Sequence, residues 1–310
     1  MSVMKFLEKK VKICYKIFYI AVLLFTLKNP YLHAQNFKKG QHEQSNIQVD
    51  WQNYFVIVNA EFKLSKKAPI SERELLREQT KEDILQLISH YLENLVVDEN
   101  RLLKNILASN DEFSREYSLF LETLEMHGMF FRENKIITSM KIPLRGKNGL
   151  LARVPLNWNH YNYESLKSNE YVGEAYQRNS YNSEYIKSLS PVKYTGLIID
   201  VRNLDFNVSL SPKIFDQNGK LIYGEEFIPP NAGKRRGIAA FLTNLNNSEV
   251  ERRVGRRPLL TTAVETSGFN KTNAVLIIRD AARIFDHEET VKNLRKCRVV
   301  FLINEKNKKK

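Results

Sequence analysis

Residues Tyr194 to Gly224 read YTGLIIDVRNLDFNVSLSPKIFDQNGKLIYG, and they decide the fold of the second half of the chain. The apolar run Leu197 to Ile199 is typical of a buried strand. A second run ends at Phe215, and Asn218-Gly219 turns the chain back into a third run, Leu221 to Tyr223. Asn-Gly between β-rich runs predicts a hairpin, because both residues tolerate positive φ. We therefore expect a strand followed by a β-hairpin.

The length and composition indicate a folded protein of two domains. With 310 residues the chain can bury a sizeable core. An apolar fraction of 43% and a charged fraction of 27% are typical of a soluble protein. The formal net charge is +13, and residues 1–34 account for +5 of it through six lysines and one glutamate. The rest of the chain is therefore still basic, at +8.

The N-terminus has the features of a secretory signal peptide, which we assign to residues 1–34. Lysines precede an apolar stretch, Ile17 to Leu27, that is too short to span a bilayer, since a helix needs about 20 residues. Cleavage after Ala34 is expected, with a retained N-terminal anchor as the alternative. Cys14 precedes the apolar stretch, so the lipid attachment of a bacterial lipoprotein is not expected. The exported chain would keep one cysteine, Cys297, and could form no intramolecular disulfide.

Residues 49–157 predict an α+β domain, preceded by a flexible polar linker at 35–48. The segment Tyr54 to Leu64 alternates in the manner of a strand. A helix is expected to begin at Ser71, whose side chain would cap it together with Glu74. Helical spacing then marks a single buried stripe. Its members are Leu76, Thr80, Ile84, Ile88, Tyr91 and Leu95.

The remainder of this domain is predicted as helix followed by hairpin. Two helical segments run from Asp98 to Leu124. After Gly128 the apolar period changes to two, and residues 136–142 and 150–156 are expected to pair with each other. Helices packed on an antiparallel sheet give the first domain an α+β fold.

A tyrosine-rich connector at 158–190 is expected to join this domain to a mixed α/β domain at 191–304. The tyrosines could form a contact surface, or they could pack as part of a linker on a neighbouring domain. In the second domain a helix is expected over 239–254. Strands are expected at 259–264, 274–278 and 299–303, with a helix from 281 to 294. The last two strands permit a parallel strand-helix-strand crossover, with an antiparallel arrangement as the alternative. Residues 305–310 form a basic tail.

Val49 to Asn100 resembles a known family of envelope proteins. The segment has Trp51 before its strand and the run REQTKED (77–83) in its helix. It resembles the LPP-twenty family of small outer-membrane lipoproteins and is similar to the N-terminal domain of flagellar assembly protein T. The resemblance implies a small α+β module in the bacterial envelope.

A second resemblance covers parts of residues 194–282. It rests on YTGLIIDVR (194–202), LSPKI (210–214), DQNGKLIY (216–223), RVG (253–255) and DAA (280–282). These stretches resemble a module of uncharacterised exported proteins from spirochaetes and related two-membrane bacteria. The resemblance implies an envelope location and supplies no catalytic residue.

The sequence contains none of the common motifs for nucleotide binding or an activated nucleophile, and one mature cysteine cannot build a Cys/His metal cluster. We therefore expect a protein that is not an enzyme, with no catalytic residue, metal or cofactor. Asp200 and Asp280 each follow an apolar strand, which is where α/β folds place ligands. The alternatives are that Asp200 pairs with Arg202 and that Asp280 caps a helix.

Two basic clusters in the second domain are further candidates for binding. Clustered arginines suit phosphate or carboxylate partners, because a guanidinium can bind them with two hydrogen bonds. For an exported protein these partners would be anionic lipid, wall polymer or an acidic protein, and no nucleic acid is expected. The alternative is scattered solvated charge. The candidate residues are Lys234, Arg235, Arg236, Arg252, Arg253, Arg256 and Arg257.

These features predict a non-enzymatic exported protein of the cell envelope, located in the periplasm or at the outer membrane. Its partners would be envelope proteins or periplasmic flagellar proteins. The alternative is a periplasmic ligand-binding protein with a cleft near Asp200 and Asp280. A pocket lined by convergent polar groups would favour this alternative, and a flat face rich in tyrosine and arginine would favour the first.

Overall fold

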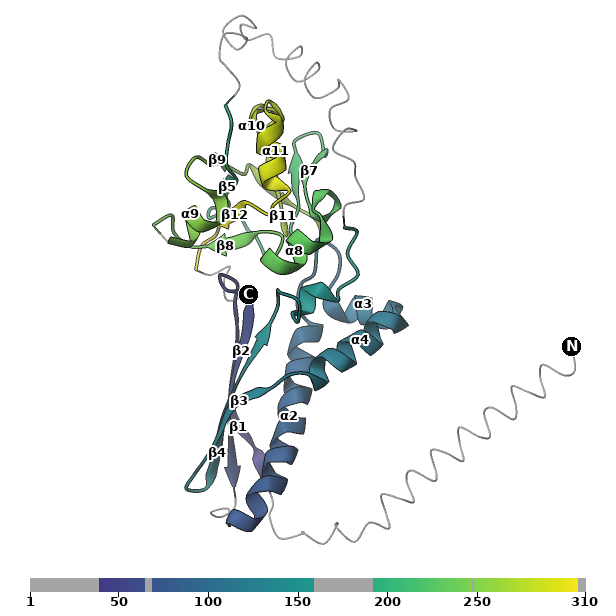
Figure 1. Ribbon diagram of the computed structural model, residues 1–310, viewed down its shortest axis with the longest axis vertical. Coiled ribbons are helices and arrows are strands. Elements are labelled where there is room, and N and C mark those ends of the chain that lie inside the picture. Colours follow the sequence, from purple (N-terminus) through teal and green to yellow (C-terminus); the bar gives the residue numbers. More distant parts are fainter. Residues whose placement is uncertain (1–38, 65–68, 159–191, 247, 306–310) are drawn as a thin grey trace, which may run out of the picture.

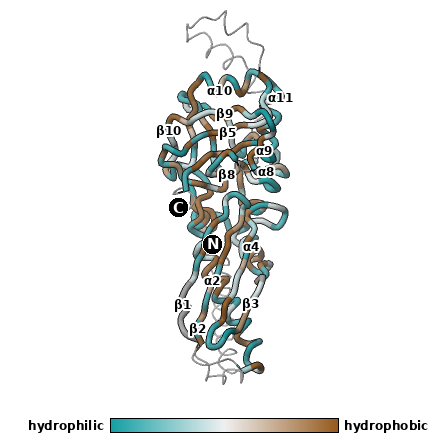
Figure 2. Tube along the Cα trace, turned by 90° about the vertical axis from the view of Figure 1, so that its left-hand side faces the viewer, coloured by the Kyte–Doolittle hydropathy of each residue, from teal (hydrophilic) through white to brown (hydrophobic). Residues whose placement is uncertain are grey.

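The computed structural model describes residues 39–64, 69–158, 192–246 and 248–305. The predicted signal peptide, nearly all of the tyrosine-rich connector and the basic tail after residue 305 lie outside these ranges. Within them, no helix combines the length and the hydrophobicity that crossing a bilayer requires. The described residues form two halves stacked along the long axis of the molecule (Figure 1, Figure 2).

The first half is an antiparallel sheet with a long helix, α2 (Arg73–Glu93), running along it (Figure 1). In β2 every second side chain is buried, as expected for a strand with one face on a core. The strands lie in the order β1 (Lys39–Asp50), β2 (Phe55–Leu64), β4 (Lys135–Pro143) and β3 (Met126–Arg132).

The buried stripe of α2 is confirmed, with Leu92 in place of the expected Tyr91. The predicted capping box is wrong. A 3₁₀ turn, η2 (Ile70–Glu72), precedes the helix, so Ser71 lies inside this turn and no side chain caps α2. Two short helices follow, α3 (Leu103–Ser109) and α4 (Asp111–Glu122). Asn110 caps α4, because its side-chain oxygen accepts a hydrogen bond of 2.8 Å from the Phe113 amide.

Two predictions for the first half are wrong. Residues 39–48 belong to β1, which pairs with β2, and not to a flexible linker. The predicted hairpin between 136–142 and 150–156 does not form, because β4 pairs with β2 and β3 instead. The leucines at 150 and 151 are buried in a 3₁₀ turn, η3 (Leu150–Ala152), so their hydrophobicity reflects burial without a strand.

The second half contains one parallel and one mixed four-stranded sheet. The parallel sheet has the order β8 (Ala240–Leu242), β12 (Val299–Leu302), β5 (Leu197–Asp200) and β9 (Leu259–Thr262). The mixed sheet has the order β10 (Glu265–Ser267), β11 (Asn273–Leu276), β6 (Ile214–Asp216) and β7 (Leu221–Tyr223). Strand β12 is buried at every position, as its continuous apolar sequence predicts.

Helices and one further 3₁₀ turn complete this half: η4 (Glu225–Phe227), α8 (Pro230–Arg236), α9 (Ser248–Val254), α10 (Ile278–Phe285) and α11 (Glu288–Leu294). The predicted hairpin is confirmed as β6 and β7, which pair antiparallel. Gly219 has a φ of 77°, and the Asp216 side chain accepts hydrogen bonds of 2.9 Å from the amides of Asn218 and Lys220. The mixed α/β class of this half and the α+β class of the first half are thus confirmed.

Two details of the second half differ from expectation. The helix predicted over 239–254 is confined to α9, because residues 240–242 form the buried strand β8. The strands around residues 274–278 and 299–303 lie in different sheets. The segment between them therefore forms no crossover within one sheet.

The two halves share one hydrophobic core, which continues from the first-half sheet into the strands of the second half. The Trp51 ring lies 5.6 Å from the Phe241 ring in an edge-on contact. Backbone hydrogen bonds also cross the junction, from Leu210 to Val96 at 3.1 Å and from Ser211 to Val97 at 2.7 Å. Side chains from both halves can therefore build one site.

Candidate functional site: an arginine pocket at the junction

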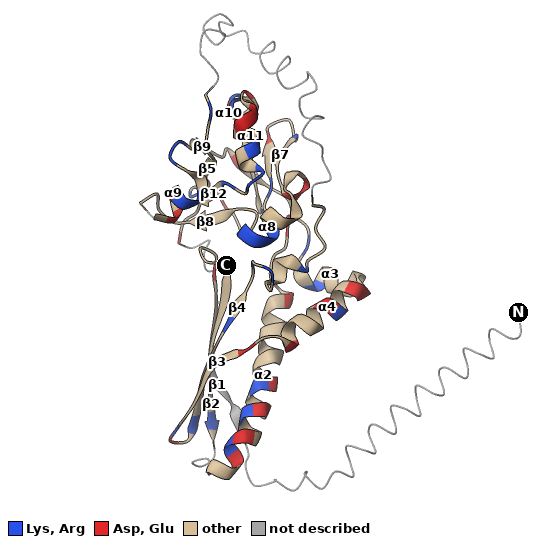
Figure 3. Cartoon of the chain, viewed as in Figure 1, with Lys and Arg blue, Asp and Glu red and all other residues tan. Residues whose placement is uncertain are grey.

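Two clusters of basic residues in the second half lie in the last turns of two short helices, α8 and α9. Figure 3 shows these blue segments on α8 and α9. Helix α8 begins with Pro230 and ends in Lys234, Arg235 and Arg236. Gly237 follows with a φ of 76°, a conformation that favours glycine. A Cβ there would lie 2.6 Å from Cζ of Tyr54, so the backbone approaches the ring closely at this point.

Side chains from both halves bind the backbone carbonyls that follow α8. Arg253 donates to the Arg236 carbonyl at 2.7 Å and to the Gly237 carbonyl at 2.8 Å. Arg145, which follows β4 in the first half, donates to the same Arg236 carbonyl at 3.0 Å. The Tyr54 hydroxyl donates to the Ala239 carbonyl. Two guanidinium groups are therefore held beside each other by a single backbone oxygen.

Arg145, Arg236 and Arg253 line a pocket of about 400 Å³. We call it the arginine pocket. The first half contributes two side chains to it and the second half contributes the remainder. The lining residues are Gln52, Arg145, Arg235, Arg236, Ala240, Leu242, Glu249, Arg252 and Arg253.

The pocket holds five guanidinium groups and one carboxylate. Glu249 pairs with Arg252, whose Nε lies 3.0 Å from the carboxylate. Across the part of the chain that the structure describes, no carboxylate pairs with Arg145, Arg235, Arg236 or Arg253. Arg253 is only 5% exposed, and its Nε is buried without a hydrogen-bond partner. The pocket therefore has an excess of positive charge.

The arginines perturb one another's ionisation. Burial lowers the pKa of Arg145, the positive charges of Arg253 and Arg252 lower it further, and the carboxylate of Glu249 opposes the shift. Burial also lowers the pKa of Arg236, and Arg253 adds to the effect. Arg145 and Arg236 remain charged at physiological pH, because the ordinary pKa of arginine is so high. An anion placed among them would relieve this repulsion.

Two buried neighbours of the pocket, Tyr54 and Cys297, are neutral at physiological pH. Burial raises the pKa of Tyr54 to about 12. Cys297 is fully buried, and burial raises the pKa of its thiol to about 11. Among the described residues, no group of three or more His, Cys, Asp or Glu side chains is arranged to hold a metal ion.

The structure brings four of the seven predicted basic residues together in the pocket: Arg235, Arg236, Arg252 and Arg253. Lys234, Arg256 and Arg257 do not line it. Gly255 ends α9 with a φ of 77° and directs the chain away. The Arg256 side chain is 90% exposed and pairs with Glu251 at 2.9 Å. Gln52, Arg145 and Glu249 were not predicted, because each stands outside the basic clusters.

Asp200 and Asp280 do not share a cleft. Asp200 is paired with Arg202 through bonds of 3.0 and 2.6 Å, and the hydrogen bond from Arg202 lowers its pKa. Asp280 lies in the first turn of α10, with Ile277 at the cap position, and accepts a 2.6 Å bond from Thr261. Thr261 of β9 pairs with Ile199 of β5, and Ile199 immediately precedes Asp200. Successive side chains point to opposite faces, so the two carboxylates lie on opposite faces of the sheet.

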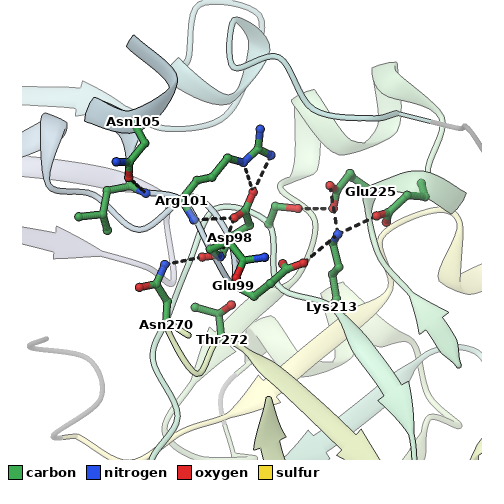
Figure 4. Close-up of polar contacts among 12 residues, drawn as sticks. Asp98, Glu99, Arg101, Asn105, Lys213, Glu225, Asn270 and Thr272 are labelled. Carbon is green, nitrogen blue, oxygen red and sulfur yellow. Dashed lines mark hydrogen bonds and ion pairs between the residues drawn. The ribbon is translucent and has the colours of Figure 1, made fainter. Parts of the chain in front are cut away.

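A second polar cluster lies at the junction and is a structural contact between the halves (Figure 4). Lys213 pairs with Glu99 of the first half at 3.3 Å and with Glu226 at 2.7 Å, and Glu225 lies 3.8 Å away. Burial lowers the pKa of Lys213, but these carboxylates outweigh burial and raise it above the ordinary value. Burial and the neighbouring Glu226 raise the pKa of Glu225 to about 7.

Comparison with known families finds a match for the second half. Residues 196–305 match the family described as Treponema pallidum Tp0624, second domain. The second half is similar to this spirochaete domain. The matched residues include α8, α9 and every pocket arginine except Arg145. The predicted resemblance to a spirochaete module is thus confirmed for this half. No curated protein matches the chain.

Proposed function

We propose that this protein is a non-enzymatic, exported component of the bacterial cell envelope that binds an anionic partner in the arginine pocket. The signal-like sequence of residues 1–34 supports export. The likeness of the second half to a domain of a spirochaete protein is consistent with that setting. The resemblance of Val49 to Asn100 to LPP-twenty lipoproteins and to the N-terminal domain of flagellar assembly protein T also supports it. The partner would be an envelope or periplasmic flagellar protein, an anionic lipid or a wall polymer.

The pocket itself is the observation that carries this proposal. Buried charges are normally paired, because leaving a charge unpaired in a protein interior is costly. Arg253 is buried and, among the described residues, has backbone carbonyls but no carboxylate as partners. A protein keeps such an arrangement at a cost in stability, and binding an anion there lowers that cost. Anion binding is therefore the function that the geometry supports best.

A second candidate is a periplasmic protein that binds a free small anion. The pocket volume of about 400 Å³ favours it, since pockets for small ligands have about 300–1,000 Å³. The site would be the arginine pocket and not a cleft at Asp200 and Asp280.

Association with isolated envelopes tests the proposed function. The protein, purified as the cell processes it, should sediment with the envelopes. The double variant Arg235→Gln/Arg252→Gln should lose this association. The matched control Arg256→Gln/Arg257→Gln removes the same charge outside the pocket and should keep it. Equal association of both variants would contradict the proposal.

A further inference from the structure

We propose that the arginine pocket binds a dianionic phosphate group, presented by a phosphate monoester or by inorganic phosphate, and that this group ties the two halves of the protein together. The inference rests on the proposed function and names the chemistry of its ligand. It is carried by the number of guanidinium groups and by their origin on three separate elements.

The charge of the pocket matches a dianion better than a monoanion. Five guanidinium groups face a single carboxylate, and that carboxylate is already paired with Arg252. A ligand with a single carboxylate would leave most of the excess positive charge of the pocket unbalanced. A phosphate monoester carries a charge of about −1.5 to −2 at neutral pH and offers three strong acceptor oxygens. It can therefore satisfy donors on several arginines at once.

The guanidinium donors of the pocket come from three separate segments of the chain. Arg235 and Arg236 come from α8, Arg252 and Arg253 from α9, and Arg145 from the segment after β4. A carboxylate is planar and suits one guanidinium that binds it edge to edge. A tetrahedral phosphate presents oxygens in several directions. Donors from three elements therefore favour phosphate.

Two of the arginines are already fixed before any ligand binds. Both Nη atoms of Arg253 donate to carbonyls, and Nη1 of Arg145 donates to one of the same carbonyls. These bonds hold the side chains in place, so little conformational entropy is lost on binding.

The pocket is larger than one phosphate group and has an apolar part. Its volume of about 400 Å³ leaves room for the small group that carries the phosphate. Ala240 and Leu242 of β8 provide an apolar wall, and Gln52 adds a neutral amide. Because Gln52 and Arg145 belong to the first half, a ligand in the pocket contacts both halves. Binding should therefore stabilise the junction.

Calorimetry on the protein, purified as the cell processes it, tests the phosphate class. Inorganic phosphate and glycerol 3-phosphate should both bind and should raise the melting temperature, whereas acetate at the same ionic strength should not. Affinity for glycerol 3-phosphate should rise from pH 5 to pH 7.5, because the second ionisation of a phosphate monoester has a pKa of about 6. Vesicles of phosphatidylcholine with and without phosphatidic acid distinguish the source. Binding to the phosphatidic acid vesicles indicates a lipid, and binding of the soluble phosphates alone indicates a free ligand.

Variants test whether the pocket is the site. Arg235→Gln/Arg252→Gln should weaken glycerol 3-phosphate binding at least about tenfold, since each removes a charged hydrogen-bond donor. Arg256→Gln/Arg257→Gln should bind as the unaltered protein does. Arg145→Lys keeps the positive charge but loses the planar guanidinium group, which can form two parallel hydrogen bonds. This variant should weaken glycerol 3-phosphate binding with little loss of stability. Absence of phosphate binding, equal binding of acetate, or equal affinity of both double variants would overturn the proposal.

The outcomes separate this inference from the proposed function. Envelope association that depends on Arg235 and Arg252, without any phosphate binding, would overturn the ligand class and leave the proposed function in place. Phosphate binding without envelope association would support the pocket and contradict the envelope role.

Discussion

Replacing Gly237 by alanine should destabilise the protein more than the same replacement at Gly219, because Tyr54 leaves no room for a side chain beside Gly237. Both glycines have a positive φ, 76° at Gly237 and 77° at Gly219. Gly237 also has a ψ of 152°, a combination that is essentially restricted to glycine. Alanine at a positive φ costs about 1–2 kcal/mol, and the ψ of Gly237 adds to that cost. At Gly219 an added Cβ meets nothing within 4 Å. Gly219 is therefore a control for a positive φ without a steric clash.

At Gly237 a steric cost is added to the strain. The new Cβ would lie 2.6 Å from Cζ of Tyr54, and the Tyr54 side chain is fully buried and bound to the Ala239 carbonyl. The ring cannot move away without breaking this bond or displacing its neighbours. Overpacking of this kind costs about 1–3 kcal/mol. We expect a loss of about 2–5 kcal/mol for Gly237→Ala and about 1–2 kcal/mol for Gly219→Ala.

Urea unfolding followed by circular dichroism measures both losses. In a Tyr54→Ala background the steric part of the cost at Gly237 should disappear, which a double-mutant cycle would show as a coupling energy of about 1–3 kcal/mol. Gly237→Ala should also weaken anion binding, because the Arg236 and Gly237 carbonyls that position Arg253 must shift. Equal losses at the two glycines, or no coupling with Tyr54, would refute the argument that the Tyr54 ring excludes a side chain at Gly237.

Four further predictions concern the junction, the end of β5 and the N-terminus. Glu225→Gln should flatten the dependence of stability on pH between about pH 5 and 8. Burial raises the Glu225 pKa from 4.5 to about 7, so the folded state holds a proton that the unfolded state has lost, and stability should fall as pH rises through 7. Urea unfolding at several pH values checks this, and an unchanged profile would contradict it. Lys213→Met should cost about 3–5 kcal/mol in the same assay, because it leaves buried carboxylates without their cation. A loss below about 1 kcal/mol would show that the cluster is not buried as described. Arg202→Gln should cost less than about 1 kcal/mol, because its pair with Asp200 is partly exposed, and a large loss would give Asp200 another role. N-terminal sequencing of the exported protein should begin at or near Gln35, whereas an intact N-terminus released only by detergent would indicate an anchor.

The sequence predicts those elements in which local pattern and burial agree. The helix α2 has one stripe at helical spacing, and β5 and β12 are continuous apolar runs between polar segments. The hairpin of β6 and β7 follows from Asn218-Gly219, since the turn chemistry is local. The local sequence is therefore sufficient to predict these elements.

Elements fixed by distant partners could not be predicted. The strand β1 is polar along most of its length, so only its pairing with β2 reveals it. The strand β8 has three residues, all buried, and three residues are too few to display a period of two. The same limit applies to the site. Arg235, Arg236, Arg252 and Arg253 attract attention as a group, whereas Arg145 lies about 90 positions before α8, where no pattern marks it.

One of the five pocket arginines comes from the first half, but the pocket depends on that half for more than this one side chain. The segment that matches the spirochaete domain contains four of the five arginines, but Arg145, Gln52 and Tyr54 lie before it. Tyr54 and Arg145 bind the carbonyls after α8 and cover them with a second protein surface. Water and salt screen charges that stand on an open surface, and they do so much less where charges are partly buried. A second-half domain by itself would present these arginines as a basic surface with weak, salt-sensitive anion binding. Packing against the first half makes that surface a pocket in which a single anion can meet several guanidinium groups.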